Sequence, residues 1–330
     1  MINRRSLLAA AASTSALVTL GACAKKSSPT AKGAAQASDS GASTASASDG
    51  GGSAADEANL LDRVKVTSAF GEDPTVDFDA PLEFSNFHST VVSKGDGPAI
   101  AEGDFIVTRS AYFDPESAEV LASQWKEGTF SPFKVDKQSV GQTATEFFTG
   151  LTSHSRFLMA GVAGTQKQKV LQVGDVVGVA LKRAEGDAQK LPAEVPGFAL
   201  GEDGAPNLTA KPNGTAPTTQ VVAPAIKGHG PAAKKGDTLI MHYRGWDWAT
   251  GEEFDSSWGR GTPFSFKLGD GQVIKGWDEG LEGATQGSQI ALILPPASAY
   301  GEAGEGNQNP LAGKTLLFVA DVLYVASPEA

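Results

Sequence analysis

The chain contains an internal repeat, and this repeat limits what it can fold into. Residues 123–134, SQWKEGTFSPFK, and residues 256–267, SSWGRGTPFSFK, share their Ser, Trp, Gly-Thr and Phe-Lys positions in register. The same offset of 133 residues, applied without a gap to 94–155 and 227–288, matches 20 of 62 residues identically. Glycine abundance alone does not keep one register over so many positions. The sequence therefore predicts a tandem duplication, in which one fold occurs twice.

Each copy has the pattern of a β-rich fold. In the second copy, 238–246 (TLIMHYRGW) and 315–325 (TLLFVADVLYV) are β-branched and aromatic runs of strand length. The one helical candidate is 276–283 (GWDEGLEG), where Trp277 and Leu281 lie one turn apart and Gly283 can end the helix. We expect an α+β fold in which each copy is a curved antiparallel sheet around one short helix.

The N-terminus has the features of an export segment over residues 1–22. Arg4 and Arg5 precede an apolar run from Leu7 to Leu20 that is too short to be a convincing permanent membrane span. The run ends at Cys23, the only cysteine of the chain, and this junction resembles a bacterial lipobox. The resemblance implies lipidation at Cys23 and anchoring at the extracytoplasmic face of the cell membrane. An ordinary signal peptide is the alternative, and the arginine pair would also suit twin-arginine export.

The remaining chain divides into four segments by composition. Residues 23–59 are rich in Ala, Ser and Gly without an aromatic residue, which predicts a flexible tether. We expect folded domains at 60–183 and 220–327, separated by a proline-rich linker at 184–219. The formal net charge of −11 repels phosphate backbones, so nucleic acid is not an expected partner.

Residue patterns of metal, phosphate or nucleophilic chemistry are not apparent in the sequence. The four histidines, at 88, 154, 229 and 242, are scattered, and no GxSxG motif occurs. We therefore expect no metal and no cofactor. Any catalysis must proceed without an acid, a base or a covalent intermediate.

The second copy carries the informative motifs. The stretch GEEFDSSWGRGTPFSFKLGDGQVIKGWDEGLEG (251–283), followed by AYGEAG and TLLFVADVL, resembles the FKBP-type peptidyl-prolyl cis-trans isomerases over residues 221–325. This resemblance implies two FKBP-like domains of the α+β class, each a curved antiparallel half-barrel sheet wrapped around one short helix, with an aromatic-lined pocket between sheet and helix. It also implies isomerisation of X-Pro bonds in polypeptides and binding of macrolide inhibitors.

The resemblance assigns roles to individual residues. Trp277 would form the pocket floor, the Ile274 backbone N–H would bind the substrate carbonyl, and Asp255 and Tyr300 would face the twisted amide. The remaining substrate-binding residues would be Tyr243, Phe254, Arg260, Phe264, Val273, Leu311 and Phe318. On strand pattern alone, Phe266 and Phe318 are expected to be largely core residues.

Two departures from the family pattern affect substrate preference. Gln272 stands where family members often have an acidic residue before Val-Ile. The loop 302–315 lacks the paired isoleucines common in the family and has Leu311 as its large apolar residue.

The first copy lacks the side chains of the expected pocket. With the 133-residue offset, the counterparts of Tyr243, Phe254, Asp255, Arg260, Phe264, Ile274, Trp277 and Tyr300 are Ser110, Leu121, Ala122, Glu127, Ser131, Gly141, Ala144 and Lys167. The conserved positions are those of the fold, such as Trp125 and Phe133. We expect the first copy to be an inactive FKBP-like domain.

Three functions remain open from sequence. The first is a peptidyl-prolyl isomerase that acts on exported polypeptides. The second is a non-catalytic holding chaperone or envelope adaptor, and the third is a structural envelope protein. The presence of Asp255, Trp277 and Tyr300 favours the isomerase.

Overall fold

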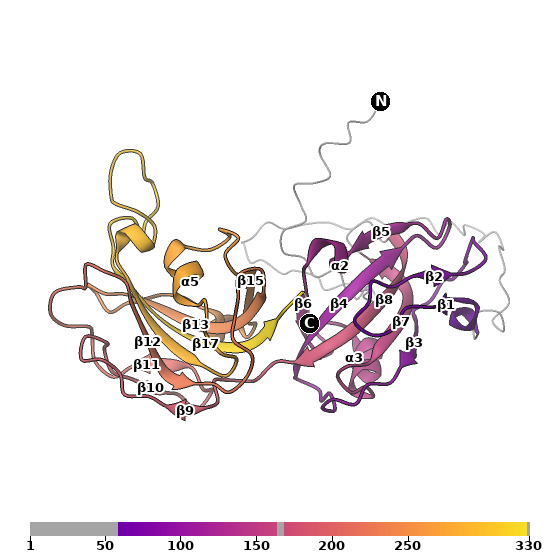
Figure 1. Ribbon diagram of the computed structural model, residues 1–330, viewed down its shortest axis with the longest axis horizontal. Helices are drawn as coiled ribbons and strands as arrows, with labels where there is room; N and C mark the ends of the chain where they lie inside the picture. The colour runs from indigo at the N-terminus through magenta and orange to yellow at the C-terminus, as the bar shows by residue number, and fades with distance from the viewer. Residues whose placement is uncertain (1–58, 164–167, 329–330) are drawn as a thin grey trace, which may run out of the picture.

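Two antiparallel sheets follow one another along the chain, one for each copy of the repeat (Figure 1). The computed structural model describes residues 59–163 and 168–328. The expected export segment, Cys23 and the tether up to residue 58 lie outside the described residues. No helix within the described ranges is long and apolar enough to cross a membrane.

The two sheets have the same strand order. The first runs β3-β7-β8-β4-β5 with β6 beside β4, and the second runs β12-β16-β17-β13-β14 with β15 beside β13. The first sheet consists of β3 (His88–Ser93), β4 (Phe105–Phe113), β5 (Val120–Ser123), β6 (Ser131–Lys134), β7 (Arg156–Ala163) and β8 (Gln168–Val179). The second consists of β12 (Val221–Lys227), β13 (Thr238–Asp247), β14 (Glu253–Ser256), β15 (Phe264–Lys267), β16 (Gln289–Leu294) and β17 (Leu316–Ala326), with β9 (Asp187–Ala188) beside β12. This shared order is what a tandem duplication produces.

Paired residues in the first sheet correspond to paired residues 133 positions later in the second sheet, except on the last strand of each copy. Ala111 pairs with Ser123 as Arg244 pairs with Ser256, both 133 residues later. On the last strands the offset becomes 146, because Tyr112 pairs with Gln172 whereas Gly245 pairs with Phe318. The connection before β17 is therefore longer than the one before β8.

This change of offset bears on one expectation. Tyr300 lies in the long connection between Leu294 and Leu316, within which the offset changes, so its pairing with Lys167 stays a prediction. Lys167 itself lies outside the described residues. The counterpart of Phe318 is Gln172.

The helices of the two copies also correspond. The expected helix is α5 (Lys275–Gly280) in the second copy and α3 (Gln142–Thr149) in the first, each lying in the concavity of its sheet (Figure 1). Each copy also has a one-turn helix that was not expected from the sequence, α2 (Gln124–Glu127) and α4 (Ser257–Arg260).

The repeated motif SxWxxG encodes the ends of these one-turn helices. The Ser123 side chain accepts a hydrogen bond from the Lys126 N–H, and Ser256 accepts one from Gly259. Gly128 and Gly261 end the helices at φ of 62° and 66°, where a Cβ atom is unfavourable. The similarity between 123–134 and 256–267 therefore reflects capping and chain reversal.

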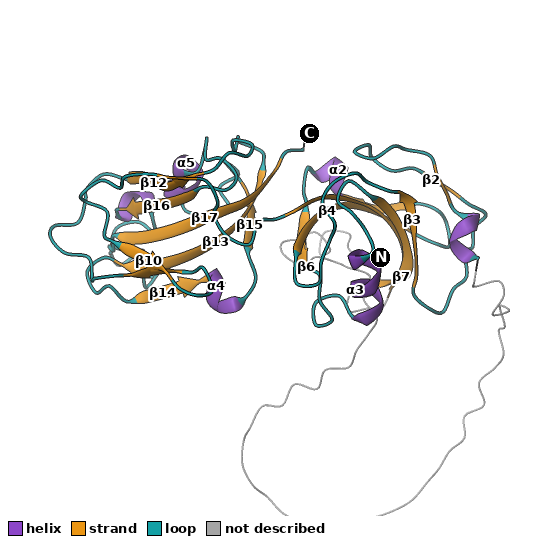
Figure 2. Ribbon diagram, turned by 90° about the horizontal axis from the view of Figure 1, so that it is seen from below, coloured by secondary structure: helices purple, strands orange, loops and turns teal. Residues whose placement is uncertain are grey.

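A segment before each sheet covers the face opposite the helix. In the first copy, η1 (Leu60–Arg63), β1 (Lys65–Val66) and β2 (Val76–Asp77) lead into residues such as Leu82 and Phe84 that pack on this face. In the second copy, β10 (Phe198–Leu200) and β11 (Pro206–Leu208) occupy the corresponding place (Figure 1), and Figure 2 shows β10 on the side of the sheet away from α5.

The prediction of a linker at 184–219 is wrong for this reason. Val195 is buried against Trp246, Trp248 and Leu317 of the second sheet. Prolines interrupt strands locally, which made the segment look like a linker, but its apolar residues have partners far away in sequence. The segment is part of the second folded unit.

The two units contact each other where β17 ends. Val107 of β4, Ile240 of β13 and Ala326 of β17 are buried together there. The Tyr324 hydroxyl donates a hydrogen bond of 3.0 Å to the Val177 carbonyl oxygen. Figures 1 and 2 show this end of β17 reaching toward the first sheet.

A buried polar pair joins the last two strands of the sheet, β7 and β8 in the first copy and β16 and β17 in the second. In the first copy Arg156 donates two hydrogen bonds to Asp175, at 2.6 and 2.8 Å. In the second copy Gln289 replaces the arginine and donates to Asp321 at 2.8 Å, while the Ala184 N–H donates to the other carboxylate oxygen at 2.8 Å. Burial outweighs these hydrogen bonds and raises the pKa of Asp321 to about 6.

Replacing Asp321 should therefore change stability in a pH-dependent way. The Asp321 carboxyl group binds its proton more tightly in the folded state than in the unfolded chain. Its favourable contribution to the free energy of unfolding is therefore present near pH 4 and is lost as the pH rises through about 6. Asp321→Asn stays neutral and keeps an acceptor for Ala184. We expect it to raise the free energy of unfolding at pH 7.5 by up to roughly 3 kcal/mol.

Thermal unfolding at pH 4 and 7.5 tests this expectation. The gain in Tm should be large at pH 7.5 and small at pH 4. Asp79→Asn, which removes the same charge at an exposed position, is the matched control and should have little effect. Equal Tm values of wild type and Asp321→Asn at pH 7.5 would contradict the expectation.

Candidate active site

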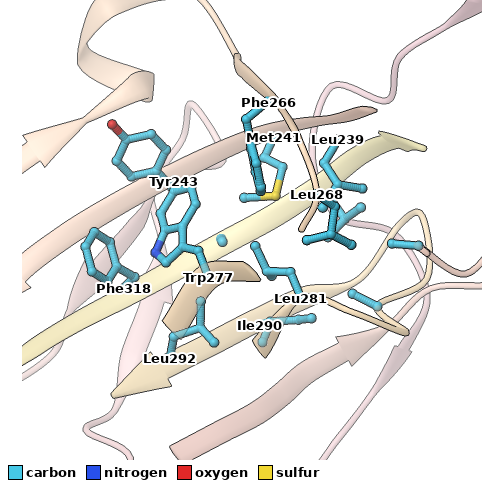
Figure 3. Close-up of a cluster of buried hydrophobic side chains, with 14 of the residues drawn as sticks. Leu239, Met241, Tyr243, Phe266, Leu268, Trp277, Leu281, Ile290, Leu292 and Phe318 are labelled. Carbon is cyan, nitrogen blue, oxygen red and sulfur yellow. The ribbon is translucent and has the colours of Figure 1, made fainter. Parts of the chain in front are cut away.

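Trp277 lies at the centre of the largest aromatic cluster in the described chain. It stands in the first turn of α5 and only 4% of its surface is exposed. Its ring meets Tyr243 and Phe318 edge to face, with centroid distances of 4.9 and 5.3 Å (Figure 3). The indole Nε1 is buried without a hydrogen-bond partner in this part of the chain. Trp277 is the floor on which the rest of the site is arranged.

Two glycines allow α5 to lie directly on β16. A Cβ atom on Gly276 would stand 2.5 Å from Leu294 Cδ2, and one on Gly280 would stand 2.7 Å from Leu292 Cδ2. The Asp278 carboxylate accepts hydrogen bonds from the backbone N–H groups of Gly269 and Gly271, at 2.8 and 3.1 Å. These contacts fix the turn that presents Val273 and Ile274 beside Trp277.

Partly buried apolar side chains surround the cluster. They pack against its buried members yet keep some exposed surface, and they are Phe254, Phe264, Val273, Ile274, Ala299, Tyr300 and Leu311. They come from β14, β15, the turn before α5 and the long connection before β17. An apolar ligand placed on this surface would remove further area from water.

A polar group closes one side of the site. The Tyr243 hydroxyl donates a hydrogen bond to the Asp255 carboxylate, which also forms an ion pair with Arg260. Arg260 Nη2 donates to the Tyr243 hydroxyl oxygen at 2.9 Å. Each of the three side chains is thereby held by the other two.

The protonation states in this group are stable around neutrality. Burial favours protonated Asp255, but the hydrogen bonds from Tyr243 and Arg260 outweigh it and lower its pKa. Burial and the hydrogen bond to Asp255 raise the pKa of Tyr243 to about 12. Burial also raises the pKa of Tyr300, with a smaller effect from the Asp255 charge. The carboxylate is ionised and both phenols are neutral near pH 7.

Two hydrogen-bond donors at the site have no acceptor among the described residues. One is the backbone N–H of Ile274, which precedes α5, and the other is the Tyr300 hydroxyl. The Asn307 side chain donates to the Tyr300 carbonyl oxygen at 2.8 Å, so the backbone of Tyr300 is held in place. Both donors are available to a bound ligand.

The structure brings together all the residues that the sequence assigned to the pocket. Tyr243, Trp277 and Phe318 are buried members of the cluster, while Phe254, Phe264, Val273, Ile274, Tyr300 and Leu311 pack around them. Asp255 and Arg260 join through Tyr243. Phe266 is buried, as its strand pattern predicted. Ala299, Asn307 and Asp278 were not expected at the site, because only the fold shows which part of a turn or loop they support.

The first copy fills the corresponding space differently. Ala144 stands in the place of Trp277, and Phe148 of α3 packs edge to face on Phe133 and Phe157, at 5.3 and 5.4 Å. In place of the contact between Tyr243 and Phe318, Gln172 donates a buried hydrogen bond of 3.0 Å to Ser110. The first copy therefore has a packed core where the second has its aromatic surface.

The described residues contain no group of three or more His, Cys, Asp or Glu that could hold a metal ion. The arrangement offers an apolar surface, one ionised carboxylate and two free donors. Such a site can bind an apolar group next to a carbonyl.

Comparison with known proteins agrees with this geometry. Residues 230–323 match the family described as FKBP-type peptidyl-prolyl cis-trans isomerase. A protein named FK506-binding protein from Streptomyces anulatus is 46% identical over 114 residues, which are 34% of this chain and 92% of the relative. A probable FK506-binding protein from Corynebacterium glutamicum is 44% identical over 112 residues, again 34% and 92% of the two chains.

The family match at 230–323 contains every described residue of the site. The alignments with the two relatives span 92% of each of them. A peptidyl-prolyl cis-trans isomerase from Arabidopsis thaliana, FKBP15-2, is 50% identical over 98 residues, 30% of this chain and 59% of that protein. With an aromatic cluster around Trp277 and relatives of this similarity, the chain belongs to the FKBP-type peptidyl-prolyl cis-trans isomerase family.

Proposed function

We propose that residues 220–327 of the second unit isomerise X-Pro bonds in polypeptides at the aromatic site around Trp277. The observation that carries this proposal is the ring of partly exposed apolar side chains packed on buried Trp277, next to the unpaired Ile274 N–H. A proline ring would lie on Trp277 between Tyr243, Phe254, Phe264 and Phe318. The carbonyl beside it would accept the hydrogen bond from Ile274.

Catalysis at such a site consists of preferential binding of the twisted amide. Resonance opposes rotation with a barrier of about 18–20 kcal/mol, and the twisted amide has lost much of the polarity of the planar one. An apolar surface therefore favours the twisted state relative to the planar state, which lowers the barrier. The fixed Asp255 and the free Tyr300 hydroxyl would interact with the amide as its charge distribution changes.

The same surface would bind macrolide inhibitors. A macrolide presents an apolar ring next to carbonyl groups, which matches the aromatic walls and the Ile274 donor. Leu311 lies on the long connection, so substrate preference at the residue before proline should depend on it.

We further propose that the first unit, residues 60–183, is an FKBP-like half-barrel domain without isomerase activity. Its strand order equals that of the second unit, but the Ser110–Gln172 hydrogen bond and the Phe148 packing replace the aromatic surface. A role in holding polypeptides fits a unit that keeps the fold and lacks the site.

The location that we propose is the extracytoplasmic face of a bacterial cell membrane, with a lipid anchor on Cys23. The basic and apolar sequence before the only cysteine supports this proposal. Clients would then be unfolded or newly exported polypeptides.

Paired substitutions in the two copies test where catalysis occurs. Phe254 and Leu121 occupy equivalent positions on β14 and β5, yet only Phe254 packs on the Trp277 cluster. Phe254→Ala should lower kcat/KM for a proline-containing peptide about tenfold, since it removes apolar contact with the bound ring worth about 1–2 kcal/mol. Leu121→Ala should leave kcat/KM unchanged.

The measurement is a proline-isomerisation assay on the full chain, with and without FK506. FK506 should inhibit wild type. The proposal fails if Leu121→Ala reduces activity as much as Phe254→Ala does, or if wild type does not accelerate isomerisation.

The pH profile of the rate tests the absence of proton transfer. The pKa of Asp255 is lowered and that of Tyr243 is raised to about 12, so neither group titrates near neutrality. We expect kcat/KM to be nearly constant from about pH 6 to 8. Tyr300→Phe should lower kcat/KM only about 2- to 12-fold and not abolish it, because one hydrogen bond contributes about 0.5–1.5 kcal/mol. A steep profile, or an inactive but folded Tyr300→Phe variant, would indicate acid–base catalysis.

Substitution of the only cysteine tests the location. Cys23→Ala should release the protein from the membrane fraction or leave the export segment uncleaved. Fractionation of the expressing cells, with the size of the product measured by mass spectrometry, separates these results from the wild-type behaviour. A processed Cys23→Ala product that still sediments with membranes would show that lipidation is not the anchor.

A further inference from the structure

A cavity of about 260 Å³ lies where the two units meet, away from the Trp277 site. Residues of the first unit form most of its wall, and the end of β17 forms the remainder. Six side chains of the lining are those of Phe70, Arg109, Trp125, Phe130, Val177 and Tyr324. Four of these six side chains are aromatic, so the walls are mostly apolar around the Arg109 cation. His154 and the carboxylate of Asp175, which is paired with Arg156, also line the cavity.

Arg109 is the unusual member of this lining. Only 6% of its surface is exposed, and no carboxylate of the described chain lies within ion-pair distance. Its guanidinium makes two long hydrogen bonds, to the carbonyl oxygens of Pro328 at 3.2 Å and Trp125 at 3.4 Å. Its Nε is buried without a partner in the same ranges. This arginine remains charged at neutral pH.

The aromatic rings offset part of the cost of burying this charge. The Arg109 Cζ atom stands 5.3 Å from the centroid of Trp125 and 5.0 Å from that of Phe130. In a buried position, cation–π contacts of this kind stabilise a guanidinium less than an ion pair with a carboxylate does. A buried cation without a counter-ion is strongly unfavourable.

The nearest carboxylates are committed elsewhere. Asp175 accepts two hydrogen bonds from Arg156 and one from the Gly71 N–H at 2.7 Å. Asp73 accepts a hydrogen bond from the Ser123 hydroxyl at 2.8 Å. The described residues therefore provide Arg109 with a cavity but with no anion of its own.

The second copy does not contain this arrangement. The counterpart of Arg109 is His242, which stacks on Trp258 at 4.1 Å as Arg109 lies over Trp125. Burial and the Arg260 charge lower the pKa of His242 to about 4, so the ring is neutral near pH 7. A permanent buried cation at this strand position is specific to the first unit.

We propose that this cavity binds a peptide segment in which a carboxylate side chain adjoins an aromatic or aliphatic side chain. The carboxylate would pair with Arg109, and the neighbouring apolar side chain would lie among Phe70, Trp125, Phe130 and Tyr324. The volume suits two side chains and excludes a folded element. The site gives the first unit a binding role that does not depend on isomerase activity.

The test uses two tripeptides, acetyl-Phe-Glu-Leu-amide and acetyl-Phe-Gln-Leu-amide, titrated into the full chain by calorimetry. All proteins carry Glu329→Gln, which removes the acidic side chain that follows Pro328 in the sequence. The glutamate peptide should bind at least tenfold more tightly than the glutamine peptide. This preference should disappear in Arg109→Met, which keeps the length of the side chain, and persist in Arg63→Met, which removes an exposed arginine.

A second variant keeps the test decisive if Arg109→Met does not fold. Val177→Phe leaves Arg109 in place and fills the cavity, so it should abolish binding of the glutamate peptide while isomerase activity remains. The proposal is overturned if the two peptides bind equally, if neither binds, or if Arg109→Met or Val177→Phe retains the preference. Displacement of the glutamate peptide by FK506 would also overturn it, because the peptide would then occupy the aromatic site.

Discussion

The antiparallel pairing of β13 with β17 runs from Thr238 opposite Ala326 to Asp247 opposite Leu316. Side chains alternate between the faces of a strand, so this register decides which residues face α5. It places Gly245 opposite Phe318, where a Cβ atom would stand 2.8 Å from Phe254 and 2.9 Å from Phe318. A slip of one residue would turn Tyr243 and Phe318 away from Trp277. The aromatic site is thus a consequence of strand register, and the loops only complete its edge.

The first copy shows that this register does not require the site. Its strands β4 and β8 pair in the equivalent way, with Tyr112 opposite Gln172. The hydrogen bond from the Gln172 amide N–H to Ser110 offsets part of the cost of burying these polar groups, although the Gln172 amide oxygen has no partner among the described residues. Backbone pairing, the glycine-ended turns and the apolar core specify the fold, while a few inward side chains specify binding. Duplication therefore allows one copy to lose the aromatic surface without losing its structure.

The sequence predicted the local elements and the residues of the site, because each depends on neighbours in the chain. The runs at 238–246 and 315–325 are confirmed as β13 and β17, and motifs in fixed order identified Trp277 and Asp255. It did not predict the packing of Val195 on Trp246, because proline content describes local backbone and not distant partners. The sequence also did not show that the offset between the copies changes from 133 to 146 before Phe318, because the connection between the last two strands differs in length between the copies. No sequence pattern distinguishes Arg109 from an exposed strand arginine, because its burial arises where the two units meet.

The positions of the two proposed sites suggest how the units would act on one client. β17 contributes Phe318 to the aromatic site and Tyr324 to the cavity at the junction, so a single strand joins them. Catalysis by apolar binding requires no moving acid or base, and the Asp255 group is already held by Tyr243 and Arg260. A conformational signal between the sites is therefore unnecessary. A client held at the Arg109 cavity would instead raise the local concentration of its prolines near Trp277, and this gain depends only on the reach of the unfolded chain between the two sites.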